Sequence, residues 1–313
     1  MTDVLLAGEA MGLFIAEDYG DFEDIEHFSK GIAGAEINVA IGLSRLGFDV
    51  SYVSKLGQEP FGYYIKNHLE KENIDTSHVL MDPVYRTGLQ MKNKVKDDDP
   101  KVAYYRKGSA FSTLSKEDVE SIDFSKIKLF HMTGIPLALT PKTREMVFYL
   151  AEKAKEHNCL ITFDPNLRPS LWEDEETMIE VLNKAAGYAN IVMPGIEEGV
   201  LLTGKDTAEE MADFYLAKGV DAVIIKDGSK GAYLKEKDKE MQLVEGFTVE
   251  RVIDTVGAGD GFAAGVISGT LDGLSIEEAV RRGNAIGSLQ VQHKSDNEAL
   301  PTRNELDAYM SES

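Results

Sequence analysis

The fold is decided by the stretch Asp254-Thr255-Val256-Gly257-Ala258-Gly259-Asp260-Gly261-Phe262, near the C-terminal end of the chain. A strand-like run over 248–253 leads into it, and a helix of small residues over 263–270 follows it. Backbone N–H groups left free at such a turn bind anions, because the helix dipole also favours negative charge. Asp260 stands at the mouth of this site, where it could take a proton from a hydroxyl while the turn holds a phosphoryl group. The turn therefore predicts phosphoryl transfer to a hydroxyl.

Two better-known phosphate-binding loops do not match this turn. A P-loop requires Lys-Ser or Lys-Thr after its glycines, and neither follows here. A dinucleotide-binding fingerprint requires a glycine where Phe262 stands, and it normally belongs to the first strand–helix unit of its domain. The alternative interpretation is a tight strand-to-helix turn in which Asp260 is only an N-cap.

Short apolar runs alternate with longer amphipathic runs through much of the chain. Buried strands are expected over 4–8, 50–54, 128–132, 160–164, 191–193 and 222–226. Helices are expected over 35–46, 62–72, 141–157, 175–186 and 209–218. This order predicts an α/β fold with a mostly parallel central sheet and helices on both faces. Ligands in such folds bind beyond the carboxyl ends of the strands.

Two regions, 11–33 and 84–112, look like strands without intervening helices. In the second region, the runs 87–95 and 102–107 flank a polar, proline-containing turn that suits a hairpin. We expect the two regions to form one small β-sheet lid over the active site, inserted into a single domain that takes in residues 1–313.

The composition limits the classes of partner. The chain has 313 residues and a formal net charge of −21, which argues against nucleic acid or an anionic membrane as a main partner. The only cysteine is Cys159, so the chain has no intramolecular disulfide and no cysteine metal cluster. No apolar run is long enough to span a bilayer, and no basic leader precedes the first strand-like run. We therefore expect a cytoplasmic protein.

A second glycine-rich helix start lies near the N-terminus, in the segment Gly31–Ala40. Gly34 and Ala35 would let a ligand approach the backbone closely, and Asn38 could direct its amide to the same place. The alternative is that these small residues pack against a sheet, with Asn38 in a buried hydrogen bond.

Polar side chains follow the predicted hairpin. Tyr104 and Arg106 share one face of a strand, and an aromatic hydroxyl beside a guanidinium suits a carboxylate or a hydroxylated ligand. The alternative is a solvated strand face. Farther along the chain, the prolines in Phe163–Pro169 enforce extended backbone, so Arg168 would project from the carboxyl end of a central strand. The alternative for Arg168 is a structural pair with Asp164.

The segment Lys226–Ala232 joins two predicted strands through a glycine-rich turn. Gly228 and Gly231 would let the backbone lie over a nucleotide, but a plain hairpin turn is equally compatible with the sequence.

Taken together, these segments resemble a known family. GIAGAEINVAIGLSRLG (31–47) and DTVGAGDGFAAG (254–265) resemble the two signatures of ribokinase-like (PfkB) carbohydrate kinases. Further stretches resemble the 2-keto-3-deoxygluconate kinases of that family: YYRKGSA at 104–110, FDPNLRPSLW at 163–172 and SDNEALPT at 295–302. The resemblance covers essentially the whole chain and implies a ribokinase-like three-layer α/β/α fold with a small β-sheet lid.

The resemblance also implies a role for individual residues. Asp260 matches the catalytic base, and Gly257, Ala258 and Gly259 match the anion hole. Substrate-binding positions are matched by Glu9, Gly34, Ala35, Asn38, Gln90, Tyr104, Arg106, Arg168, Asp260 and Asp296. Nucleotide-binding positions are matched by Asn166, Lys226, Gly228, Ser229, Gly231, Gly257, Gly259 and Asn284. Glu198 matches a residue linked to Mg²⁺, although Gly195 replaces the asparagine of that motif, and Asp254 matches a monovalent-cation position.

The implied activity is ATP-dependent phosphorylation of the primary hydroxyl of a keto-deoxy sugar acid, most simply 2-keto-3-deoxygluconate to its 6-phosphate, with ATP, Mg²⁺ and in some members K⁺. The partners would be the sugar acid, ATP and a second copy of the chain through the β lid. The alternatives are a kinase for a neutral sugar such as fructose or ribose, and a non-catalytic sugar-acid-binding paralogue. An NAD-dependent dehydrogenase is disfavoured by Phe262.

Overall fold

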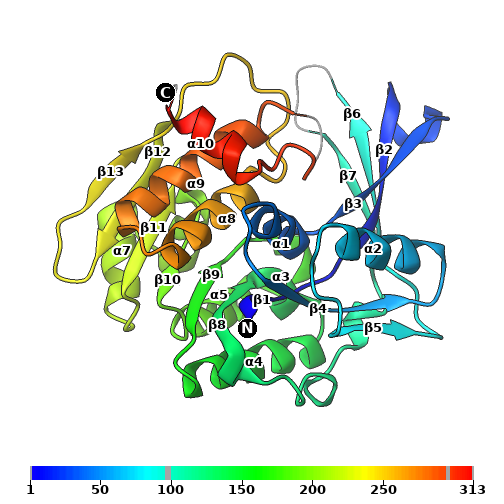
Figure 1. Ribbon diagram of the computed structural model, residues 1–313, viewed down its shortest axis with the longest axis horizontal. Helices are drawn as coiled ribbons and strands as arrows, with labels where there is room; N and C mark the ends of the chain where they lie inside the picture. The colour runs from blue at the N-terminus through cyan, green and yellow to red at the C-terminus, as the bar shows by residue number, and fades with distance from the viewer. Residues whose placement is uncertain (1, 96–99, 294–296, 312–313) are drawn as a thin grey trace.

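Nine strands form the main sheet, in the spatial order β13-β12-β11-β10-β9-β8-β1-β4-β5 (Figure 1). They are β1 (Thr2–Ala7), β4 (Val50–Gly57), β5 (Val79–Asp82), β8 (Ile127–Thr133), β9 (Leu160–Asp164), β10 (Ile191–Val192), β11 (Ala222–Lys226), β12 (Gly231–Glu236) and β13 (Gln242–Glu245). The pairings from β5 to β11 are parallel, whereas β12 and β13 add an antiparallel edge. The computed structural model describes residues 2–95, 100–293 and 297–311.

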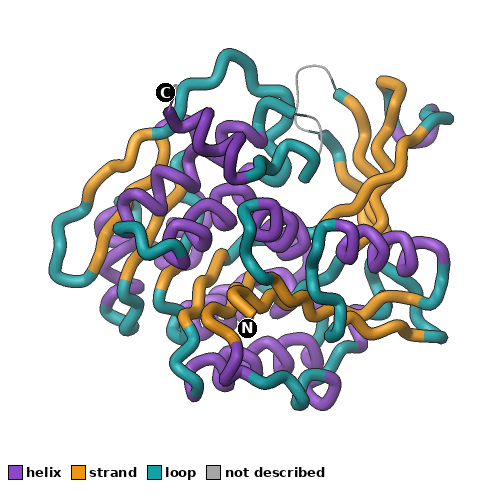
Figure 2. Tube along the Cα trace, viewed as in Figure 1, coloured by secondary structure: helices purple, strands orange, loops and turns teal. Residues whose placement is uncertain are grey.

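Helices cover both faces of this sheet (Figure 2). They are α1 (Ala35–Arg45), α2 (Pro60–Lys71), α3 (Gly134–Leu139), α4 (Pro141–Glu156), α5 (Glu175–Ala186), α6 (Ile196–Thr203), α7 (Ala208–Leu216), α8 (Ala258–Leu271), α9 (Ile276–Gln290) and α10 (Arg303–Ser311). One apolar core contains side chains of α1, α2, α8, α9 and α10, and the other contains side chains of α3 to α7. The predicted mostly parallel α/β architecture is therefore confirmed.

The side chains of β1 explain how one strand serves both cores. Val4 and Leu6 point into the first core, and Leu5 and Ala7 point into the second, because successive strand residues face opposite sides. All four are at most 2% exposed. A strand buried on both faces reads as a continuous apolar run, as Val4–Ala7 does in the sequence.

The lid is a separate sheet of four strands in the order β3-β2-β6-β7. It consists of β2 (Met11–Tyr19), β3 (Phe28–Ala33), β6 (Leu89–Lys94) and β7 (Val102–Tyr105). It projects from one side of the body in Figure 1, and β2 begins shortly after β1 ends. Its strands thus come from the two regions of the sequence in which a lid was expected.

One expected element is absent from the described part of the chain. Residues 248–253 form no strand, although the sequence suggested one. The N–H of Ile253 donates instead to the carbonyl of Val291, just beyond α9, at 2.7 Å. The side chains of Val252 and Ile253 are 56% and 45% exposed. The apolar residues of this segment therefore do not form the buried face of a strand. Helix α8 also begins five residues earlier than expected, inside the glycine-rich turn.

No helix among the described residues has the length and apolar character required to cross a membrane.

Candidate active site

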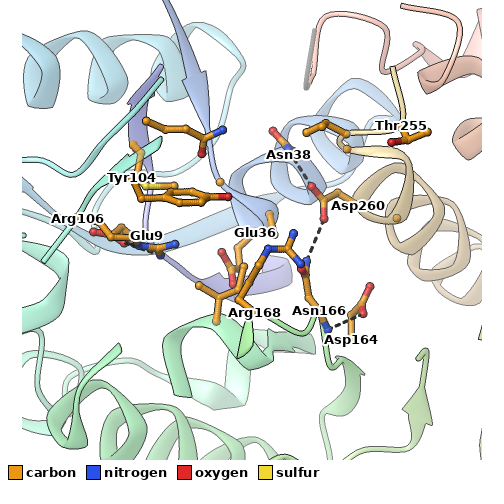
Figure 3. Close-up of a pocket in the computed structure, with 18 of the residues that line it drawn as sticks. Glu9, Glu36, Asn38, Tyr104, Arg106, Asp164, Asn166, Arg168, Thr255 and Asp260 are labelled. Atoms are coloured by element: carbon orange, nitrogen blue, oxygen red, sulfur yellow. Dashed lines mark hydrogen bonds and ion pairs between the residues drawn. The ribbon is translucent and has the colours of Figure 1, made fainter. Parts of the chain in front are cut away.

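A cavity of about 420 Å³ lies where the carboxyl ends of the central strands, the lid and the N-terminus of α8 meet (Figure 3). Its lining residues are Glu9, Met11, Gly34, Ala35, Glu36, Asn38, Gln90, Tyr104, Arg106, Ile135, Asp164, Asn166, Arg168, Glu198, Lys226, Thr255, Val256, Gly257, Gly259 and Asp260. We call it the acceptor cavity. It brings together most of the residues that the sequence singled out, from segments more than two hundred positions apart.

Asp260 lies in the first turn of α8 and points into the acceptor cavity. One carboxylate oxygen accepts a hydrogen bond from the Asn38 amide at 2.8 Å, and the other accepts one from the Asn166 amide at 3.4 Å. Burial raises the pKa of Asp260 to about 7; the Asn38 hydrogen bond lowers it and the charge of Asp164 raises it further. A carboxylate with this pKa is suited to accept a proton near neutral pH.

The glycine-rich turn forms the N-terminus of α8. Gly257 is its N-cap residue, with a φ of 80° that a residue with a side chain adopts only at a cost. Gly257 and Gly259 line the acceptor cavity, whereas the N–H of Ala258 donates to the carbonyl of Thr255 at 3.3 Å. The first N–H groups of a helix have no partner within the helix, so this turn can hold an anion beside Asp260.

Lys226 lies at the end of β11 and pairs with Asp164, at the end of β9, with 2.6 Å between Nζ and Oδ2. Burial alone would lower the pKa of the Lys226 amine, but the carboxylates of Asp164 and Glu198 more than offset this effect and raise it. The Lys226 side chain therefore stays positively charged. The pair also means that Asp164 is bound to Lys226 rather than to Arg168.

Arg106 is held by a carboxylate of the body. Its Nε and Nη2 donate to the same oxygen of Glu9 at 2.7 Å and 2.6 Å, and Glu9 also accepts a hydrogen bond from Ser109. Arg106 is 8% exposed and Glu9 is 2% exposed. The guanidinium lies 5.7 Å from the centre of the Tyr104 ring. Arg106 thus enters the cavity with its charge balanced, and it keeps further N–H donors for a ligand.

Arg168 is the more exposed arginine of the cavity. Its Nη1 donates to the carbonyl of Leu167 at 2.7 Å, which directs the guanidinium toward the space between Glu36 and Asp260 in Figure 3. Asn166 adopts a φ of 42°, a left-handed conformation that asparagine tolerates better than most residues. This local turn places the Asn166 amide against Asp260.

A second cavity of about 300 Å³ lies on the other side of the glycine-rich turn. We call it the donor cavity. It is lined by Lys226, Gly228, Ser229, Gly231, Gly246, Phe247, Val249, Val252, Thr255, Ala258, Gly259, Phe262, Asn284, Gly287, Ser288 and Val291. Lys226, Thr255 and Gly259 also line the acceptor cavity, so the two cavities meet at the N-terminus of α8. A largely apolar cleft beside an anion site fits a nucleotide base beside its phosphates.

Glu198 spans two backbone segments. One of its oxygens accepts the N–H of Leu167 and the other accepts the N–H of Gly195, both at 2.7 Å. No group of three His, Cys, Asp or Glu side chains within 2–95, 100–293 and 297–311 could hold a metal.

Two predicted residues lie elsewhere. Asp254 does not line the acceptor cavity; its carboxylate is buried against Lys92 of the lid. Asp296 lies outside the described residues.

Sequence reasoning missed Glu36. It is fully buried in the first turn of α1 and accepts a hydrogen bond from Thr133. Its Oε2 has no hydrogen-bond partner within the described structure. Burial raises the pKa of Glu36 to about 7. An acidic residue between Ala35 and Ile37 in an otherwise apolar helix start was the signal in the sequence.

The chain is similar in sequence to known sugar-acid kinases. The chain is 48% identical over 310 residues to 2-dehydro-3-deoxygluconokinase of Bacillus subtilis (strain 168), covering 99% of this chain and 95% of that protein. It is 29% identical to 5-dehydro-2-deoxygluconokinase of Shouchella clausii (strain KSM-K16), with 99% and 96% coverage.

Solved structures share the fold. A PfkB protein from Polaromonas sp. JS666 is 43% identical with a TM-score of 0.91, covering 98% of this chain and 100% of that one. A fructokinase double mutant from Vibrio cholerae O395, bound to fructose, ADP and a potassium ion, is 29% identical with a TM-score of 0.86 and coverages of 99% and 98%. Residues 1–303 match the pfkB family of carbohydrate kinases. The chain therefore belongs to the pfkB family of carbohydrate kinases.

Proposed function

We propose that this kinase is a 2-dehydro-3-deoxygluconokinase, which transfers the γ-phosphoryl group of ATP to the primary hydroxyl of 2-keto-3-deoxygluconate. The observation that carries the proposal is the presence of Asp260, Tyr104 and Arg168 in one cavity that adjoins an anion-binding helix start. The similarity to the Bacillus subtilis enzyme extends over the whole chain and supports the same substrate.

Asp260 acts as the general base. The substrate hydroxyl lies against its carboxylate, gives it a proton and attacks the γ-phosphorus, while the bond to the β,γ-bridging oxygen breaks and ADP leaves. The N–H groups at the start of α8 and the Lys226 ammonium stabilise negative charge on the transferred group. Asn38 and Asn166 keep the carboxylate oriented toward the cavity.

The substrate carboxylate binds among Arg168 and the lid-side residues Tyr104 and Arg106, which line the same cavity. Arg168 carries the attraction, because the charge of Arg106 is already balanced by Glu9. Tyr104 and the remaining Arg106 donors add hydrogen bonds. An acid substrate explains why arginines converge here in a chain with a net charge of −21.

The nucleotide binds in the donor cavity. Gly228, Ser229 and Gly231 form its edge, and Asn284 fixes that edge by donating to the carbonyls of Val244 and Glu245 at 3.0 Å and 3.1 Å. Mg²⁺, when it enters with ATP, neutralises phosphate charge. Both oxygens of Glu198 already accept backbone N–H groups, so this carboxylate fits contact with metal-bound water better than direct ligation.

The decisive experiment is an ADP-release assay with 2-keto-3-deoxygluconate, its C4 epimer, fructose and ribose. We expect the highest kcat/KM for one of the two sugar acids. A higher kcat/KM for fructose or ribose would favour a neutral-sugar kinase, and absence of ATP turnover with every compound would favour a non-catalytic paralogue. Asp260→Asn should lower kcat by about 10²–10⁴-fold with nucleotide binding retained.

We also infer that body and lid act as one kinase domain and that the lid contributes to a homo-oligomer. The lid leaves Tyr105, on the face opposite Tyr104, 64% exposed, which supports a subunit contact. Sedimentation of Tyr105→Lys beside the wild type tests this inference. Since the enzyme uses ATP, we infer that it works in the cytoplasm.

A further inference from the structure

A buried ion pair joins the lid to the turn that binds phosphate. Lys92 of β6 lies with its Nζ 2.5 Å from Oδ2 of Asp254. The Lys92 side chain is 3% exposed and the Asp254 side chain is 7% exposed. A lysine is rarely buried to this degree unless its charge is paired, as it is here.

Asp254 fixes the loop that leads into the helix start. Its second oxygen accepts the N–H of Val256 at 3.0 Å, and the preceding residue, Ile253, is held by the carbonyl of Val291. Val256 and Gly257 line the acceptor cavity. The position of Asp254 therefore affects the backbone two to three residues later, where the N–H groups that face the transferred phosphoryl lie.

A carboxylate in this position needs a cation, because a buried charge without a counter-ion is strongly destabilising. The related fructokinase from Vibrio cholerae has been solved with a potassium ion. The sequence resemblance to the family implies a monovalent-cation position at Asp254. In this chain the Asp254 carboxylate is already paired with the Lys92 ammonium, which does not fit the use of the same oxygen by a metal cation.

We propose that Lys92 is a positioning residue that supplies the counter-ion of Asp254, so that the phosphate-binding turn is ordered by the lid and needs no potassium ion. This inference rests on the proposed kinase function. It assigns to the lid a second role, beyond covering the sugar acid.

The register of β6 couples the two roles. Gln90 and Lys92 are two residues apart on one strand and therefore share a face of the lid. Gln90 lines the acceptor cavity, and Lys92 contacts the loop before α8. One strand of the lid therefore contributes both to the acceptor cavity and to the order of the phosphate-binding turn.

The test compares wild type, Lys92→Met and the matched control Lys94→Met over a series of KCl concentrations, with ionic strength held constant by tetramethylammonium chloride. Lys94 lies on the same strand but donates to the carbonyl of Glu17. We expect wild type and Lys94→Met to be insensitive to K⁺. Lys92→Met should lose about tenfold or more in kcat, and K⁺ should restore part of the loss and raise the melting temperature.

Potassium dependence of the wild type would overturn the proposal, as would a Lys92→Met enzyme no more impaired than Lys94→Met. If K⁺ fails to restore Lys92→Met, or if that variant folds poorly, the double variant Lys92→Met/Asp254→Asn decides. A melting temperature above that of Lys92→Met supports the pair, and one equal to or below it overturns the proposal. Because melting temperatures need no substrate, they remain informative if the substrate assay contradicts the proposed function.

Discussion

Asp260 lies between two amide side chains and close to other carboxylates, and this environment makes its ionisation sensitive to pH near neutrality. Its pKa is raised to about 7, chiefly by burial. Because a general base must be ionised, kcat/KM should fall about tenfold per pH unit below pH 6 and level off above about pH 8. Initial rates at saturating Mg²⁺ across this range check the prediction.

Asn38 provides the control for this pH profile. Its hydrogen bond lowers the pKa of Asp260, so Asn38→Ala should move the acid limb to higher pH. An unchanged limb in Asn38→Ala, or a wild-type plateau that extends down to pH 5, would contradict the assignment of the limb to Asp260.

Arg168 should determine affinity for the acid group. Arg168→Ala should raise KM for the sugar acid by roughly 10–100-fold, since a hydrogen bond to a charged group contributes about 1.5–3 kcal/mol. Arg168→Lys, which keeps the charge but loses the planar fork, should be intermediate. Steady-state kinetics with the sugar acid and with a neutral sugar check this. Equal losses on both substrates would argue against a carboxylate contact.

At the residue scale, the sequence predicted which side chains meet but not how they are paired. Asn38 and Asp260 each follow a glycine-rich helix start, so their approach could be inferred from the two motifs. The Glu9–Arg106 pair could not, because it joins the end of a body strand to the end of a lid strand. Only the relative placement of the two sheets determines that Arg106 has a carboxylate partner.

Among the elements, α8 and α9 pack at unusually close range. A Cβ atom built on Gly265 of α8 would lie 2.5 Å from the Cα of Gly283 in α9. Gly265→Val should therefore push α8 and its Asp260 out of position and destabilise the fold by about 1–3 kcal/mol.

Thermal unfolding and kcat of Gly265→Val check this expectation, with Gly187→Ala as the control. Gly187 has an ordinary helical φ at the end of α5, and its added Cβ would come no closer than 3.4 Å to another residue's carbonyl. A Gly265→Val enzyme with wild-type stability and kcat would show that α8 tolerates displacement.

Helices α1, α2, α4, α5 and α7 and the buried strands of the main sheet could be predicted because their apolar residues recur with a period that reflects burial, whereas α9 was not predicted. The segment 248–253 could not, since its apolar residues are exposed and its backbone bonds to the end of α9 rather than to a sheet. Helix α8 starts at Ala258 rather than Ala263 because packing against α9 supports glycines that are poor helix formers by themselves.

For the whole molecule, buried carboxylates link stability to pH. The pKa of Glu36 is raised to about 7, above its ordinary value of 4.5. The folded state therefore favours protonated Glu36. The stabilisation that the protonated side chain provides is fully present below about pH 4.5 and is lost as the pH rises through 7. The free energy of unfolding should decrease over that interval.

Glu36→Gln should relieve this loss, raising the melting temperature relative to wild type by about 2–5 °C at pH 8 and by less at pH 5. Calorimetry at the two pH values measures the difference, with the exposed Glu240→Gln as a control. An equal shift at both pH values would show that the ionisation of Glu36 is not responsible.

The hydrogen bond between Asn38 and Asp260 has a consequence for synthesis of the chain. Its two residues are 222 positions apart. At about 5–20 residues per second, a ribosome needs roughly 10–45 s to travel from one to the other. During that time the nascent chain carries an acceptor site without its base. A kinase assembled in this order cannot consume ATP until nearly all of it has been translated.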